Sequence, residues 1–183
     1  AAWAAAAGGG SVAVLAYDVQ GSTLDAAGFL RFTGRADRKA SSELFASGIF
    51  VSRPDASAAQ RPSVRDEQGR LTLSWTNLER AQISLPWPVA EDGFSTVWTD
   101  NSGQGWRDGD VIALNQDIAL THYRLFKEAW QRRVNESAPG YRPSADARKL
   151  ADEARVLIAQ ARAQGSDQSR AATFDKALRA VAL

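Results

Sequence analysis

The chain has 183 residues, of which 44% are apolar and 23% charged, a composition typical of globular proteins and not of disordered ones. It has no cysteine, which excludes disulfides, thiolate metal sites and cysteine nucleophiles. The net charge of +1 is unevenly distributed, because residues 1–114 carry −3 and residues 115–183 carry +4. The basic residues are dispersed and not clustered, so we expect the two parts to dock on one another and expect no nucleic-acid partner.

The first 11 residues are rich in Ala and Gly and predict a flexible N-terminal tail. Such a stretch fits the remnant of an exported leader or a linker, so the expected location is periplasmic or extracellular. No run approaches the roughly 18 apolar residues that span a bilayer, and we expect no transmembrane segment.

Residues 12–114 predict a β-rich domain, because short runs of β-branched and aromatic residues alternate with turns. The clearest strand is 70–76, where Leu71, Leu73 and Trp75 share one face. The expected strands are 12–17, 29–33, 44–51, 70–76, 82–85, 94–99 and 111–113. This spacing is typical of a β-sandwich of the jelly-roll type.

The stretch from Leu85 to Val89 reads Leu-Pro-Trp-Pro-Val. Two prolines fix φ on either side of Trp87 and remove two backbone donors. This predicts a rigid corner that closes the strand-rich part and holds the indole on an extended ledge.

Residues 115–183 predict about three helices after the sandwich. Asn115 is a good N-cap for the first, which the Pro139-Gly140 pair ends. Ser144 starts the second, and Ser166 with Asp167 starts the third after Gly165. The third helix reaches Leu183 without a stop signal, so we expect a further domain downstream.

Five short segments carry a family resemblance: Leu30-Arg31-Phe32, Gly69–Leu73, Leu85–Val89, Ala113–Ala119 and Phe174–Leu178. Over residues 29–183 the chain resembles the non-catalytic N-terminal region, a β-sandwich with helices, that precedes the barrel of bacterial glycoside hydrolase family 10, endo-1,4-β-xylanase-like proteins. The resemblance implies an accessory module that positions a downstream catalytic domain. The barrel and its two glutamates are absent here, so no catalytic residue is implied, and we expect this chain not to be an enzyme.

Tryptophans are the candidate ligand-binding residues, because pyranose rings stack on flat exposed aromatics. Trp75 and Trp98 lie in alternating strands and predict core positions. Trp87 and Trp106 lie at the corner and in a turn, and they are the candidate polysaccharide-stacking residues. Trp87 could instead wedge the sandwich against the helices.

The stretch from Asp100 to Asp110 is rich in Asp and Gly and offers oxygen ligands for a structural calcium ion through Asp100, Asp108 and Asp110. It lacks the EF-hand pattern, and solvated turn residues are the favoured interpretation, with no cofactor. The single histidine, His122, lies between apolar helix positions and predicts a hydrogen-bonded packing residue.

Two functions remain open. The favoured one is an accessory module of a carbohydrate-active protein that also binds polysaccharide weakly. The alternative is a structural or interaction module that docks a partner protein without binding sugar. A sugar module must expose two coplanar aromatics, whereas an interaction module must expose an apolar patch on its helices.

Overall fold

The computed structural model describes residues 9–15, 48–67, 70–90, 93–137 and 140–182. Two expected strand segments, 16–17 and 29–33, and the first part of 44–51 lie outside the described residues. Within them the chain forms, in order, β1 (Gly10–Leu15), β2 (Phe50–Ser52), β3 (Ser63–Glu67), β4 (Arg70–Trp75), β5 (Gln82–Ala90), β6 (Gly93–Thr99), β7 (Val111–Ala113), α3 (Leu114–Glu136), α4 (Ala145–Ala163) and α5 (Asp167–Ala182).

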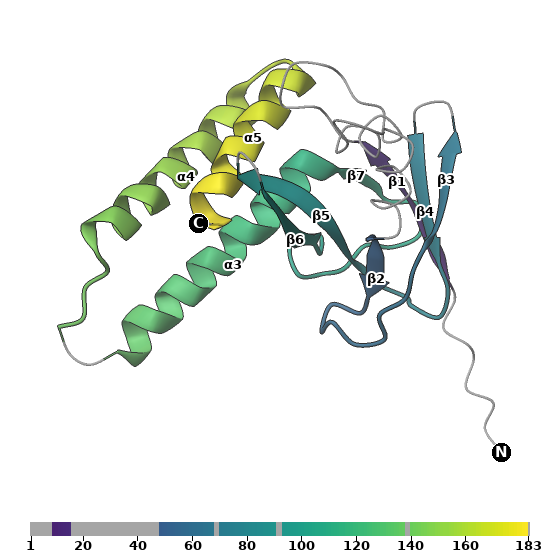
Figure 1. The fold of residues 1–183 in the computed structure, drawn as a ribbon, viewed down its shortest axis with the longest axis horizontal. Helices are drawn as coiled ribbons and strands as arrows, with labels where there is room; N and C mark the ends of the chain where they lie inside the picture. Colours follow the sequence, from purple (N-terminus) through teal and green to yellow (C-terminus); the bar gives the residue numbers. More distant parts are fainter. Residues whose placement is uncertain (1–8, 16–47, 68–69, 91–92, 138–139, 183) are drawn as a thin grey trace.

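The strands form two open sheets, with orders β3-β4-β1-β7 and β2-β5-β6. The predicted jelly-roll sandwich is therefore wrong, and the described residues form a mixed α/β arrangement of two small open sheets with three helices. Figure 1 shows β5 and β6 between the helices and strands β1, β3 and β4. The reason is that α3 contacts β6 and α5 contacts β5, so helices cover a sheet face that a sandwich would cover with strands.

The four-stranded sheet combines local and long-range pairings. β3 and β4 form an antiparallel pair, with Ser63 opposite Ser74, and β4 pairs antiparallel with β1. β7 pairs parallel with β1, with Val14 opposite Ile112. Because α3 begins directly after β7, this parallel pair fixes where the first helix leaves the sheet.

Strand β5 continues past both prolines, with a register shift between Pro88 and Ala90, so the predicted rigid corner at Trp87 is wrong. Pro86 lies opposite Thr96 and Pro88 opposite Phe94 in the pairing with β6. Alternate residues of a strand direct their backbone groups to opposite edges. The backbone groups of Ser84 point toward β2, so those of Pro86 and Pro88 point to the same edge of β5. Strand β2 pairs with β5 only as far as Ser84, and the two prolines lie beyond that point. Their missing N–H groups therefore remove no hydrogen bond to β6.

The helices begin close to the predicted positions. Ser144 caps α4, where its hydroxyl accepts from the N–H of Ala147 at 3.1 Å. Ser166 accepts from the N–H of Ser169 at the start of α5. Helix α3 differs, because it begins at Leu114 and Asn115 is not its cap. No helix within the described ranges has both the length and the apolar character needed to cross a bilayer.

One buried cluster joins the sheets and the helices. It includes Val12 and Leu73 of the four-stranded sheet, Trp87 of β5, Ile118 of α3 and Phe174 of α5. The predicted boundary at residue 114 therefore marks a change of secondary structure within one continuous core.

Candidate functional site

Both candidate sugar-stacking tryptophans are buried. Trp87 is 2% exposed, and its indole N–H donates to the carboxylate of Asp175 in α5 at 2.9 Å. Trp106 is 5% exposed, pairs through its backbone with Ala81, and its indole N–H has no hydrogen-bond partner among the described residues. Neither indole presents a face to solvent, so neither offers the stacking platform that the sequence suggested. Trp87 instead has the wedging position that the sequence left open.

Of the two tryptophans predicted for the core, Trp75 is buried and Trp98 is only half-buried. Trp75 is 4% exposed and its indole donates to the carbonyl of Leu78, which confirms a core position. His122 accepts a hydrogen bond from the backbone N–H of Trp98 at 3.2 Å, and the two rings lie 4.6 Å apart. Burial lowers the pKa of His122, with Asp100 opposing, which keeps Nε2 available as an acceptor. His122 is therefore the hydrogen-bonded packing residue that was predicted.

The three carboxylates proposed for calcium have separate protein partners. Asp100 accepts from the N–H of Gly103 and pairs with Arg124 at 2.6 Å. Asp108 accepts from the N–H and hydroxyl of Ser11, while Asp110 accepts from the N–H of Arg107. In the described part of the chain no three His, Asp or Glu side chains gather as metal ligands. These carboxylates tie loops to neighbouring elements.

Two carboxyl groups, those of the half-buried Asp117 and the buried Asp175, lie where helices meet strands. Burial raises the pKa of Asp117 to about 6, and the hydrogen bond from the N–H of Ala113 partly opposes this. Burial also raises the pKa of Asp175, while the indole of Trp87 and the guanidinium of Arg179 oppose it. Both groups hold backbone or side-chain donors across element junctions, which is a structural role.

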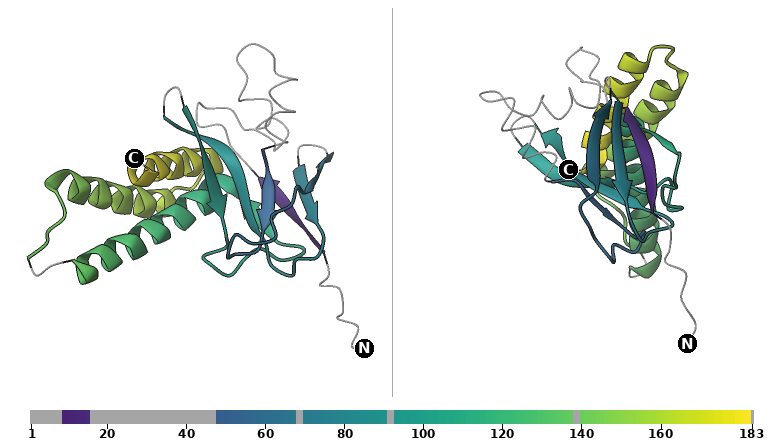
Figure 2. Two further views of the ribbon diagram at one scale, coloured as in Figure 1. Left: turned by 60° about the horizontal axis from the view of Figure 1, so that its bottom comes forward. Right: turned by 90° about the vertical axis from the view of Figure 1, so that its right-hand side faces the viewer.

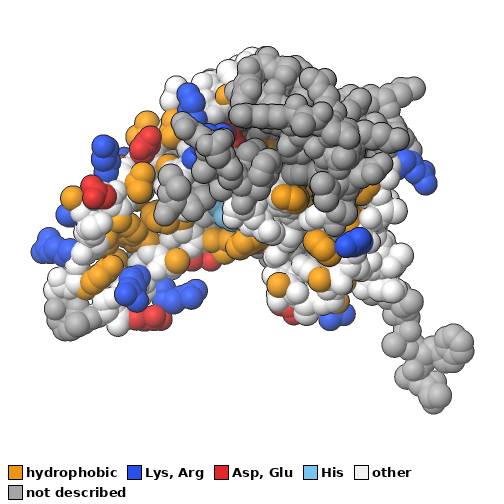
Figure 3. All heavy atoms as spheres, viewed as in Figure 1, with side chains coloured by type: hydrophobic (Ala, Val, Ile, Leu, Met, Phe, Trp, Pro, Cys, Tyr) orange, Lys and Arg blue, Asp and Glu red, His pale blue; other side chains and the backbone are white. Residues whose placement is uncertain are grey.

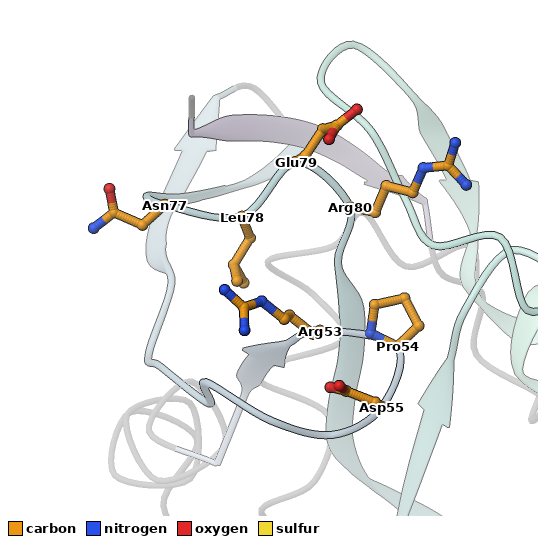
Figure 4. Close-up of a pocket in the computed structure, with 7 residues that line it drawn as sticks. All are labelled: Arg53, Pro54, Asp55, Asn77, Leu78, Glu79 and Arg80. Carbon is orange, nitrogen blue, oxygen red and sulfur yellow. The ribbon is translucent and has the colours of Figure 1, made fainter. Parts of the chain in front are cut away.

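A hollow of about 440 Å³ lies beside the turn after β2 and the turn after β4. Its lining residues are Arg53, Pro54, Asp55, Asn77, Leu78, Glu79 and Arg80. In Figure 4 the guanidinium of Arg53 points toward Leu78, whereas the ends of Asn77 and Arg80 point away from the centre. Asp55 already accepts from the N–H and hydroxyl of Ser57. The hollow mixes both charge signs and has no aromatic lining residue, so it favours neither sugar stacking nor one class of ion.

The strongest candidate surface is the end of the helical layer remote from the sheets. Both α3 and α4 extend past the end of α5 in Figures 1 and 2, and α5 packs against both of them. We call the apolar residues there the open-end face. It consists of Phe126, Trp130 and Val134 of α3 with Ala147, Leu150 and Ala151 of α4.

Burial decreases along α3 toward this end. The apolar stripe begins at Ala119, which is buried, continues through Tyr123, Phe126 and Trp130, which are half-buried, and ends at Val134, which is 38% exposed. The spacing of three and four residues keeps all five on one side of the helix. The rings of Phe126 and Trp130 lie 5.5 Å apart, so the exposed part of the stripe is also ordered by aromatic contact.

Helix α4 shows the same decrease in the opposite chain direction. Ala161, Ile158 and Ala154 are buried, whereas Ala151 and Ala147 are only half-buried. These positions again follow helical spacing, so they form one stripe. Within the described residues, α5 packs against the buried part of both stripes and not against the more exposed part.

The surroundings of the open-end face are basic. Residues 123–157 contain eight Lys and Arg and five Asp and Glu. Figure 3 shows hydrophobic side chains at this end between Lys and Arg side chains. Lys127 lies over the ring of Tyr123 at 5.5 Å, and Arg133 over Tyr141 at 5.9 Å. These cation–π contacts hold positive charge close to the apolar stripe.

The sequence analysis did not anticipate the exposed apolar residues at this end of α3.

Comparison with known proteins gives no relative: no family model, no curated protein and no solved structure matches this chain.

Proposed function

We propose that this chain is a non-catalytic docking module that holds a partner protein or domain on its open-end face. The carrying observation is the uncovered apolar stripe of α3, which ends in Trp130 and the 38%-exposed Val134. Covering that stripe would remove apolar surface from water, which is the dominant favourable term in protein association.

Burial of the tryptophans weighs against the polysaccharide function. Trp87 and Trp106 are 2% and 5% exposed, so a sugar ring could reach neither without local unfolding. The xylanase-like resemblance supports a narrower proposal for the partner. By that proposal the docked unit is a carbohydrate-active domain, and this module positions it.

Site-specific photo-crosslinking tests the docking function. A photoreactive phenylalanine analogue replaces Trp130 in one variant and Val156 in a control variant. Val156 is 54% exposed, and it lies two residues from the buried Ala154, on the outer side of α4. Irradiation in the native host should give a crosslinked peptide at position 130, identified by mass spectrometry, and none at position 156. Equal crosslinking at both positions, or none at 130, would contradict docking at this face.

Affinity electrophoresis on xylan tests the alternative. The wild-type chain should migrate equally with and without xylan in the gel. Retardation by xylan would revive the polysaccharide function, and its site would then have to lie away from Trp87 and Trp106.

A further inference from the structure

One side of the three-stranded sheet carries two aromatic side chains in a row across its strands. Phe50 of β2 lies opposite Ser84 of β5, and Ser84 lies opposite Trp98 of β6. Directly opposite residues of antiparallel strands project from the same side of a sheet, so the two rings flank a small serine. We call Phe50, Ser84 and Trp98 the aromatic row. We infer that it binds a proline-rich, extended segment of a partner protein, independently of docking at the open-end face.

The two sides of this sheet differ in burial. Val51 and Ile83, one position along from the row, project from the other side and are 0% and 1% exposed. In the row itself Phe50 is 39% exposed, while Ser84 and Trp98 are half-buried. Figure 3, seen from the same side as Figure 1, shows hydrophobic side chains in the region where Figure 1 draws β2 and β5. Apolar rings that stay partly open on one side of a sheet form a candidate contact surface.

The spacing of the two rings matches one turn of a polyproline II helix. Neighbouring strands lie about 4.8 Å apart, so two strand steps separate the backbones of Phe50 and Trp98 by about 9.6 Å. A polyproline II helix repeats every three residues and rises about 3.1 Å per residue, which gives about 9.3 Å per turn. Prolines at positions i and i+3 of a segment that crosses the strands can therefore contact both rings. Aromatic side chains on a protein surface are the usual receptors for such prolines.

The polar groups near the row also suit a proline-rich segment. Among the described residues nothing accepts from the indole N–H of Trp98, and this atom is not buried. The guanidinium of Arg61 lies 5.7 Å from the centre of the Phe50 ring, and β2, β5 and β6 contain no Asp or Glu. A proline-rich segment has carbonyl acceptors and few N–H groups, so it needs donors. Sugar hydroxyls need acceptors as well, so a polysaccharide fits this face less well.

Two labelled peptides test this inference on the whole chain. One peptide of about 12 residues carries Pro-x-x-Pro repeats. Its control has the same composition, with the prolines moved to every second position so that no two are three residues apart. Fluorescence anisotropy should show binding of the Pro-x-x-Pro peptide at least about fivefold tighter than binding of the control. The preference should persist at high salt, because the expected contacts are between uncharged groups.

Three substitutions locate the binding site. Phe50→Ala should weaken binding of the Pro-x-x-Pro peptide at least about fivefold, since one proline loses its aromatic contact. Trp98→Phe should also weaken it, because the change keeps a ring but removes the indole donor. Val111→Ala, in β7 of the other sheet, should leave binding unchanged. Phe50 and Val111 are 39% and 59% exposed, so both alanine variants should keep the melting temperature of the wild type.

Four results would overturn the inference. They are no binding of the Pro-x-x-Pro peptide, equal binding of both peptides, no greater loss in Phe50→Ala than in Val111→Ala, and retardation by xylan that Phe50→Ala abolishes. The last result would assign the aromatic row to a polysaccharide. Crosslinking at position 130 reports on the open-end face alone, so the proposed function and this inference can fail separately.

Discussion

The indole of Trp87 and the carboxylate of Asp175 form a buried hydrogen bond of 2.9 Å between residues 88 positions apart in the sequence. It joins strand β5 to helix α5, and the second carboxylate oxygen accepts from Arg179 at 3.0 Å. The exposed fractions are 2% for Trp87 and 3% for Asp175, so water cannot replace a lost partner. This bond fixes the last helix on the sheet, and it accounts for a polar indole at the centre of the core.

Removing the indole donor should therefore destabilise the protein. Trp87→Phe keeps an aromatic ring but leaves Asp175 with one donor fewer, and we expect a loss of about 1–3 kcal/mol in the free energy of unfolding. Urea denaturation measures it. Trp130→Phe is the matched control, because Trp130 is only half-buried, and its effect should be smaller. Equal effects of the two substitutions would show that ring size and not the hydrogen bond determines stability.

The carboxyl of Asp117 should make stability fall as the pH rises. Its pKa is raised from the ordinary value of 3.8 to about 6, so the folded state binds the proton more tightly than the unfolded state does. The resulting stabilisation is complete below about pH 4 and is lost as the pH rises through about 6. Asp117→Asn should consequently raise the free energy of unfolding by about 1–3 kcal/mol at pH 8 and change it little at pH 4.

Urea denaturation across pH 4 to 8 measures this step, with Asp146→Asn as the control. Asp146 lies in the first turn of α4 and is exposed, so its substitution should leave the pH profile of the wild type in place. A profile that Asp117→Asn does not flatten would mean that this carboxyl is not the source of the pH dependence.

The ion pair between Asp100 and Arg124 should contribute more stability than a pair on the surface. Asp100 also accepts from Thr121 and Gly103, so Asp100→Ala removes the acceptor that ties the loop after β6 to α3. We expect a loss of about 1–3 kcal/mol, since the aspartate is buried while the arginine is partly exposed.

Asp152→Ala provides the comparison, because the pair of Asp152 with Arg155 is 74% and 66% exposed at its side chains. That loss should be below about 1 kcal/mol. Calcium or a chelator should leave the melting temperature of the wild type unchanged. A calcium-dependent rise in melting temperature that Asp100→Ala abolishes would instead support a calcium site at Asp100.

Truncation of Trp75 tests the core of the four-stranded sheet. Trp75→Ala removes a side chain that is 4% exposed and leaves the carbonyl of Leu78 without its indole donor. The expected loss is about 3–5 kcal/mol by chemical denaturation. Val111→Ala, at a position in β7 that is 59% exposed, should change stability by less than about 0.5 kcal/mol. A Trp75 effect under about 1 kcal/mol would contradict a core role.

Local signals predicted local structure well. The cap residues Ser144 and Ser166 placed the starts of α4 and α5, and alternation placed β4 with Leu73 and Trp75 buried. These features depend on residues a few positions apart, so they can be predicted from one sequence.

Pairings between distant segments could not be predicted in the same way. Nothing local shows that β1 pairs parallel with β7, or that helices and not strands cover β5 and β6. The burial of Trp87 follows from such a distant contact, the one with α5. The prolines beside Trp87 suggested a corner because the sequence does not show which edge of the strand their backbone groups face.

The backbone of the three-stranded sheet has a consequence for solubility. Along the edge of β5 that β2 covers only as far as Ser84, Pro86 and Pro88 have no N–H to donate to an incoming strand. On the opposite edge, the N–H of Trp98 in β6 is already bonded to His122. Open strand edges are where sheets of separate molecules join into aggregates, and prolines or covering side chains prevent such growth. One histidine and two prolines therefore limit intermolecular sheet extension at both borders of this sheet.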